Sequence, residues 1–238
     1  MSTMKKQAKI YIATLIVVAL LAGGTIWAFA SEGVSKRKAA ADAGKSLKEN
    51  YQTAENVVVA KINGEPIYQH EVNLKKLINQ ISYDNLKDDP AYKDERLAAS
   101  LAIKTEEEIL TEIAQFRVVK KEAEKVGISV TQEEVVARQR ESIKKLKQLV
   151  TMDYGDAKEK YEINQKFLEG LGVTEEEYIN GIGAQIEIET MIKTQYITWF
   201  YQEEAKKREQ NPNYKTVSYI DYLDRLLDNS NLEILLKE

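Results

Sequence analysis

The feature that most restricts this chain is a run of uncharged residues near its N-terminus. Residues 10–30 carry no charged side chain, and their only polar side chains are those of Tyr11, Thr14 and Thr25. A helix of about 20 apolar residues spans the hydrocarbon core of a bilayer. We therefore expect this segment to enter a membrane. It separates a short basic tail, residues 1–9, from a body that must fold on one side of that membrane.

Two interpretations of the apolar segment follow from its details. Its length and the bulky Ile26 and Trp27 favour a retained single-pass anchor, with the tryptophan suited to the membrane interface. The glycine pair at 23–24 and the A-F-A sequence at 28–30 favour a signal peptide that is cleaved. We predict an anchor in the cell membrane, with secretion after cleavage following Ala30 as the alternative. Both interpretations place the body on the extracytoplasmic side.

The composition of the body excludes several classes of function. Beyond Ala30 the chain carries 31 basic and 38 acidic residues. Nucleic-acid binding requires a basic surface, so we predict no nucleic-acid partner. The absence of cysteine excludes disulfides and thiolate chemistry. With His70 as the one histidine, we expect neither a histidine-based metal site nor a catalytic triad.

The start of the body is marked by a hairpin pattern. Residues 31–55 are polar, lack apolar periodicity and are predicted to form a linker, so that the folded domain spans residues 56–238. In the stretch "VVVAKINGEPIY", the pair Asn63-Gly64 is typical of a two-residue hairpin turn. Proline cannot donate a ladder hydrogen bond, so Pro66 predicts an edge strand. An isolated hairpin is marginal, and residues 231–238 are the best candidate for a third strand.

Between these ends the apolar spacing is helical. Thr131 with Glu134, and Thr174 with Glu177, are capping boxes that predict two helix starts. Gly127 is a natural stop for the helix before the first box. The fold class is therefore mainly α, with a small hairpin and a C-terminal strand. The predicted helices span residues 69–84, 93–125, 131–150, 157–170, 175–208 and 214–228.

No motif in the chain specifies catalysis. The pair His70-Glu71 lacks the second histidine of a zinc motif. The sequences "GLG" at 170–172 and "GIG" at 181–183 lack the third glycine of a dinucleotide loop and are more typical of helix stops and close packing. Runs of glutamate at helix starts are explained by the helix dipole. We predict that the protein is not an enzyme and takes no cofactor or metal.

The aromatic side chains of residues 196–204, "YITWFYQEE", admit two interpretations. Consecutive helical positions cover every face of a helix, so these side chains cannot all enter one core. The segment is either a buried helix that joins two layers or an exposed apolar patch that binds unfolded chains. On the second interpretation the predicted peptide-binding residues are Tyr196, Trp199, Phe200 and Tyr201.

Taken together, the motifs resemble a known family. The stretches "VVAKINGEPIYQHEV", "EIAQFRVVKKEAEKVGISVTQEEV", "FLEGLGVTEEEYINGIGAQIEIETMI" and "NLEILL" are similar, in this order, to the N-terminal domain of SurA-type and PrsA-type extracytoplasmic chaperones. The resemblance covers roughly residues 55–238. The segment between Gln210 and Asn231 is too short for the parvulin prolyl-isomerase domain of many relatives. The family also usually has serine or threonine near Tyr68 to cap the first helix.

The resemblance implies an ATP-independent chaperone without isomerase activity. Its partners would be unfolded or partly folded exported proteins, bound transiently by apolar surfaces between helices, and the membrane, reached through residues 10–30. The alternative is a membrane-tethered interaction or scaffold protein that holds one specific partner. Broad, weak binding favours the chaperone, and a saturable, sequence-specific complex favours the scaffold.

Overall fold

A computed structural model describes residues 34–52, 57–86 and 102–235. The predicted membrane segment, residues 10–30, lies outside these ranges. Within them, no helix combines the length and the apolar character that crossing a bilayer requires.

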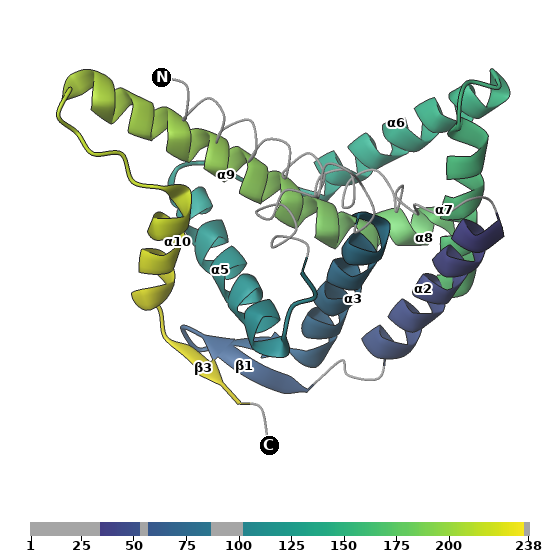
Figure 1. The fold of residues 1–238 in the computed structure, drawn as a ribbon, viewed down its shortest axis with the longest axis horizontal. Coiled ribbons are helices and arrows are strands. Elements are labelled where there is room, and N and C mark those ends of the chain that lie inside the picture. Colours follow the sequence, from purple (N-terminus) through teal and green to yellow (C-terminus); the bar gives the residue numbers. More distant parts are fainter. Residues whose placement is uncertain (1–33, 53–56, 87–101, 236–238) are drawn as a thin grey trace.

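The described chain is mainly helical, with one small antiparallel sheet in the order β2-β1-β3. Its elements are α2 (Val34–Gln52), β1 (Val58–Ile62), β2 (Glu65–Tyr68), α3 (Gln69–Leu86), α5 (Glu106–Lys125), α6 (Gln132–Thr151), α7 (Ala157–Leu171), α8 (Glu175–Asn180), α9 (Ile182–Gln210), α10 (Tyr219–Asp228) and β3 (Leu232–Ile234). In Figure 1 the sheet lies at the lower side of the molecule, α9 along the upper side, and α3 and α5 between them.

The hairpin forms as its sequence predicts. Asn63 and Gly64 both adopt positive φ, 51° and 83°, which gives a two-residue turn the twist that matches the strands. Pro66 lies on β2, an edge strand of the sheet. The predicted C-terminal strand is confirmed, because Ile234 pairs with Ala60 of β1 in antiparallel register. The chain ends of the body therefore meet at the sheet.

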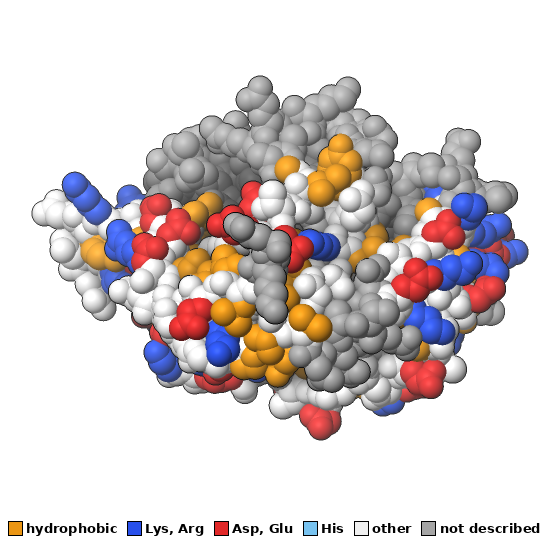
Figure 2. Space-filling view, turned by 90° about the horizontal axis from the view of Figure 1, so that it is seen from below, with side chains coloured by type: hydrophobic (Ala, Val, Ile, Leu, Met, Phe, Trp, Pro, Cys, Tyr) orange, Lys and Arg blue, Asp and Glu red, His pale blue; other side chains and the backbone are white. Residues whose placement is uncertain are grey.

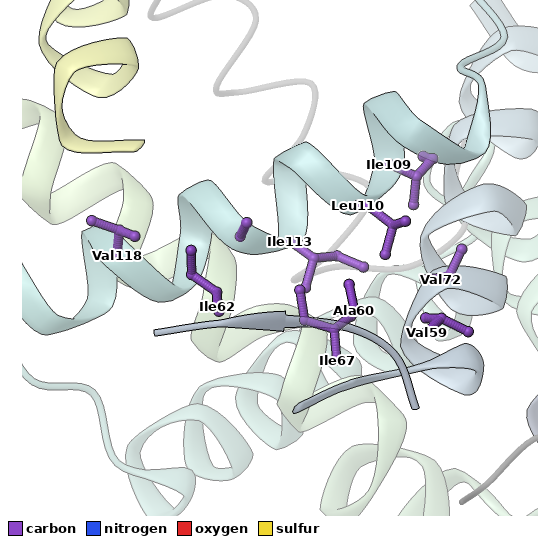
Figure 3. Packing of buried hydrophobic residues seen from close by; sticks show 10 residues of the cluster. Val59, Ala60, Ile62, Ile67, Val72, Ile109, Leu110, Ile113 and Val118 are labelled. Atoms are coloured by element: carbon purple, nitrogen blue, oxygen red, sulfur yellow. The ribbon is translucent and has the colours of Figure 1, made fainter. Parts of the chain in front are cut away.

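The main core lies between this sheet and α5. Figure 3 shows Ala60, Ile62 and Ile67 of the strands directed toward Ile113 of α5. Val72 closes the cluster from α3 and is fully buried. Alternation along the strands and helical spacing along α5 place these side chains on facing surfaces, so one layer of helices covers one face of the sheet.

A side-chain carboxylate caps the start of α3. Glu71 accepts a hydrogen bond from the Tyr68 backbone N–H at 2.8 Å. Arg117 of α5 pairs with the same carboxylate at 2.8 Å and donates to the Pro66 carbonyl at 2.6 Å. One arginine therefore joins the hairpin, the start of α3 and α5.

Three helix boundaries differ from the prediction. Helix α5 begins at Glu106 rather than near residue 93, because Thr105 and Glu108 form a capping box. The predicted start, residues 93–101, lies outside the described residues. The capping boxes at Thr131 and Thr174 are confirmed.

The predicted single helix over residues 175–208 is two helices, α8 and α9, which are separated at Gly181. Gln132 of α6 donates to the Asn180 carbonyl at 2.7 Å and so satisfies a carbonyl at the end of α8. A Cβ at Gly183 would lie 2.8 Å from the ring of Tyr178. The glycine therefore permits the close packing of α8 on the start of α9.

The polar segment assigned to a linker is largely a packed helix. Residues 34–52 form α2, which buries Ala40 and Leu47 against α7. A Cβ at Gly44 would lie 2.2 Å from the Phe167 carbonyl oxygen, and one at Gly170 would lie 2.0 Å from the Ala41 carbonyl oxygen. The two backbones are in contact at these glycines, so the predicted linker is wrong for residues 34–52.

The last predicted helix, residues 214–228, begins only at Tyr219, because a buried carboxylate holds the preceding segment extended. Glu204 of α9 accepts hydrogen bonds from the Tyr214 hydroxyl at 3.0 Å and the Val217 N–H at 3.0 Å. Lys207 contributes an ion pair at 2.8 Å. Burial alone would raise the pKa of Glu204, but these donors outweigh burial and lower the pKa below its ordinary value of 4.5.

This network gives a pH-dependent prediction. A carboxylate with a lowered folded-state pKa stabilises the protein above pH 4.5, and the contribution is lost as the pH falls through the folded-state pKa. We expect Glu204→Gln to lower the free energy of unfolding at neutral pH by about 1–3 kcal/mol. The variant should also lose less stability than the wild type between neutral pH and pH 3. Urea unfolding at several pH values measures both effects.

The neighbouring variant Glu203→Gln is the matched control, because Glu203 is partly exposed and pairs with Lys206, which is 63% exposed. It should unfold within about 0.5 kcal/mol of the wild type at each pH. Equal pH profiles for Glu204→Gln and the wild type would show that Glu204 does not stabilise the segment before α10.

Candidate client-binding cleft

The predicted peptide-binding aromatic residues do not form one exposed surface. Tyr196 and Phe200 are 1% and 4% exposed and belong to the core between α5, α9 and α10. The Tyr196 hydroxyl is hydrogen-bonded to that of Tyr222 at 2.7 Å, and the ring centroids of Phe200 and Tyr222 lie 4.8 Å apart. For these two residues the buried-helix interpretation is confirmed. Helix α10 covers both side chains, so neither is exposed for a peptide to contact.

The other two predicted residues lie nearer to the surface. Trp199 is half-buried and stacks on Tyr196, with ring centroids 5.3 Å apart. Tyr201 is 38% exposed and meets the edge of Phe200. A single exposed tyrosine beside a half-buried tryptophan is ordinary surface composition. These residues therefore offer no contiguous apolar patch.

A larger hollow lies elsewhere, between α3, α5 and α9, and we call it the α3–α5–α9 cleft. Its volume is about 700 Å³, which is within the range of clefts that hold small ligands or several side chains. Its apolar lining consists of Leu74 and Ile78 of α3, Ile113 and Phe116 of α5, and Ile186 of α9. The edge strand β2 contributes Glu65 and Tyr68 at one end.

The apolar wall extends beyond the cleft. Leu74, Ile78 and Ile186 also border a smaller cavity of about 30 Å³, whose other walls include Leu47 of α2 and Phe167 of α7. The apolar stripe of α3 is thus wider than one neighbouring helix can cover. One edge of the stripe packs toward α2 and α7, and the other edge lines the cleft.

A triad of charged residues lies on the walls of the cleft. Lys193 donates to Oε1 of Glu189 at 2.6 Å, and Lys75 of α3 donates to the same oxygen. Burial alone would raise the pKa of Glu189, but the two ammonium groups outweigh burial and lower it to about 2. Burial and the neighbouring Lys193 lower the pKa of Lys75. Lys193 also lies 5.3 Å from the centre of the Phe116 ring.

At the rim, the charges are balanced in pairs. Arg117 pairs with Glu71 at 2.8 Å, and Lys121 pairs with Glu65 at 2.7 Å. The hydrogen bond from Lys121 is the main cause of a lowered pKa at Glu65. These pairs join α5 to β2 and to the start of α3, so they fix one end of the cleft.

The described part of the chain offers little for metal chemistry. Within it, no group of three or more His, Cys, Asp or Glu residues is placed to hold a metal ion. His70 lies in the first turn of α3 and stacks on Tyr68 at 5.6 Å between ring centroids, as expected for a residue at a helix start.

Another hollow, of about 430 Å³, lies between α6 and α8. It is lined mainly by charged and polar side chains such as Arg140, Lys147 and Glu176.

Sequence reasoning missed the cleft because its walls are distant in the chain. Lys75 and Glu189 are separated by 114 positions, and no local sequence pattern predicts their contact. The sequence signal that could have indicated the cleft is the wide apolar stripe of α3. Leu74, Leu77 and Ile78 point in directions too different for one neighbouring helix to cover them all.

Comparison with known proteins identifies no relative. No protein-family model matches the chain, and neither a curated protein nor a solved structure matches it significantly. The resemblance to SurA-type chaperones therefore remains a prediction from the order of the hairpin, the capped helices and the closing strand.

Proposed function

We propose that this protein is an ATP-independent chaperone that holds unfolded segments of exported proteins in the α3–α5–α9 cleft. The observation that carries the proposal is the cleft itself, a hollow of about 700 Å³ with an apolar wall contributed by three helices. We further propose that residues 10–30 attach the protein to the cell membrane, with the body on the extracytoplasmic side. No residue is assigned a catalytic role.

The size and composition of the cleft suit weak, reversible binding. Burying one leucine or isoleucine side chain contributes about 1.5–3 kcal/mol. The cleft accommodates only a few such side chains, and ordering a disordered segment costs about 2–5 kcal/mol or more. The net affinity is therefore low, which allows a client to dissociate and continue folding.

The distribution of surface charge supports the same function. In Figure 2 hydrophobic side chains gather near the centre of the face, and charged side chains of both signs lie toward both ends. Surface charges of both signs, with an acidic excess over the body, keep a protein soluble while it carries an apolar client. The scaffold alternative would use the same cleft for one dedicated partner.

A cleft variant tests the proposal. The full chain, held in lipid nanodiscs, is mixed with several unrelated unfolding proteins, and their aggregation is followed by light scattering. We expect the wild type to suppress aggregation and Ile78→Gln to require about tenfold more protein for the same effect, because the amide weakens apolar contacts in the cleft. Empty nanodiscs provide the blank.

The matched control is Ile220→Gln, a chemically identical change on α10, where the side chain is 51% exposed and outside the cleft. It should act like the wild type, and circular dichroism should show both variants folded. If the wild type suppresses the aggregation of no client, the chaperone proposal is contradicted and the scaffold alternative is favoured. Equal loss of suppression in both variants would contradict the cleft as the binding site.

A further inference from the structure

The charges of the cleft are not fully balanced. Its lining includes five cationic side chains and four carboxylates, whereas the whole chain has a net charge of −4. The rim pairs of Arg117 with Glu71 and Lys121 with Glu65 neutralise each other. Lys120 and Glu124, one helical turn apart on α5, contribute one positive and one negative charge, which cancel in the net charge of the lining. The excess of positive charge therefore lies at the triad, where Lys75 and Lys193 share one carboxylate.

Among the described residues, the two lysines of the triad use few of their hydrogen-bond donors. Each ammonium group has three donors. Within the described residues, the acceptor that both lysines reach is the same oxygen, Oε1 of Glu189. The side chains of Lys75 and Lys193 are 22% and 34% exposed, so they are partly withdrawn from water but accessible from the cleft. A second carboxylate would supply both the missing negative charge and the missing acceptors.

The triad is also adjacent to the apolar lining. Leu74 and Ile78 flank Lys75 on α3, Ile186 precedes Glu189 on α9, and Phe116 lies beneath Lys193. A bound segment that places an apolar side chain on this lining would bring its neighbouring residue to the lysines. Electrostatic attraction is stronger in such a partly dry site than on the open surface.

We propose that the cleft selects client segments in which an aspartate or glutamate is flanked by aliphatic residues, and that the acidic side chain binds between Lys75 and Lys193. This inference rests on the proposed function, because it names the kind of segment that the same cleft takes. It gives the cleft a specificity for sequence, with apolar contacts supplying affinity and the lysines supplying discrimination.

Peptide binding tests the inference. Three fluorescent peptides share leucine and isoleucine flanks and differ only in a central Asp, Asn or Lys. Their affinities for the full chain in nanodiscs are measured by anisotropy at low and high salt. We expect the Asp peptide to bind about tenfold more tightly than the Asn peptide, and the Lys peptide to bind most weakly. Added salt should reduce these differences.

The decisive variant is Lys193→Gln, which removes the excess charge and leaves Glu189 paired with Lys75. The preference for the Asp peptide over the Asn peptide should fall from about tenfold to about twofold or less. Lys206→Gln is the matched control, since it removes the same charge from the same helix at an exposed position outside the cleft. It should keep the full preference.

The outcomes separate this inference from the function on which it rests. If wild-type protein binds the Asp and Asn peptides equally, the selection of acidic segments is wrong although client binding stands. If Lys206→Gln loses the preference as fully as Lys193→Gln does, the effect belongs to overall charge and the triad is not the site. If no peptide binds and no client is protected, the proposed function itself is overturned.

Discussion

Replacing Gly170 by valine is expected to separate α2 from α7 and to lower the free energy of unfolding by about 3 kcal/mol. A Cβ at this position would lie 2.0 Å from the Ala41 carbonyl oxygen, so the two helix backbones must move apart. The intrinsic helix propensity of valine is slightly better than that of glycine. The loss must therefore come from the helix contact, and denaturant unfolding measures it.

Limited proteolysis shows where the damage occurs. We expect the Gly170→Val protein to be cut within α2, residues 34–52, at protease levels that leave the wild type intact. Ala39→Val is the matched control, because Ala39 lies on α2, the partner helix of Gly170, but is exposed. It should change stability by less than about 1 kcal/mol. If Gly170→Val has wild-type stability and an unchanged cleavage pattern, the packing of α2 on α7 is contradicted and the linker interpretation is supported.

The second large effect is expected at the aromatic segment of α9. Phe200→Ala should lower the free energy of unfolding by about 3–5 kcal/mol, because it removes a buried ring from the core between α9 and α10. Phe200 lies 5.3 Å and 4.8 Å, between ring centroids, from Tyr219 and Tyr222. Thermal and denaturant unfolding provide the measurement.

The adjacent Tyr201→Ala variant is the control, since Tyr201 is on the exposed side of α9. Its stability should change by at most about 0.5–1 kcal/mol, and its suppression of client aggregation should stay close to that of the wild type. If Phe200→Ala instead stays fully stable and loses client binding, the aromatic segment is a binding surface after all. A loss of activity in an unfolded Phe200→Ala protein has no bearing on the site.

The features that were predicted correctly from the sequence are those set by neighbouring residues. Asn63 and Gly64 tolerate positive φ whatever the rest of the chain does, so the hairpin turn was predictable. A capping box needs only residues three positions apart, which is why Thr131 and Thr174 marked real helix starts. Thr105 carries the same signal, but the apolar stripe upstream of it suggested an earlier start and concealed it.

The misassigned features depend on contacts between distant segments. Helix α2 is polar and shows no strong apolar stripe, and its packing relies on Gly44 meeting the backbone of α7. A glycine in a polar stretch is ordinarily read as a sign of flexibility. Here Gly44 allows the backbones of α2 and α7 to approach closely. Only the position of α7 distinguishes a packing glycine from a flexible one. Likewise, the late start of α10 depends on Glu204, which lies in another helix.

The sequence by itself determined the class of fold, the hairpin, the capped helix starts and the strand that closes the sheet. The tertiary structure decided which residues face a hollow: it buried Tyr196 and Phe200 under α10 and brought Lys75 to Glu189 across 114 positions. The physical reason is the distance along the sequence over which each interaction acts. Backbone conformation and capping depend on a few adjacent residues, whereas burial and charge pairing depend on how whole helices pack.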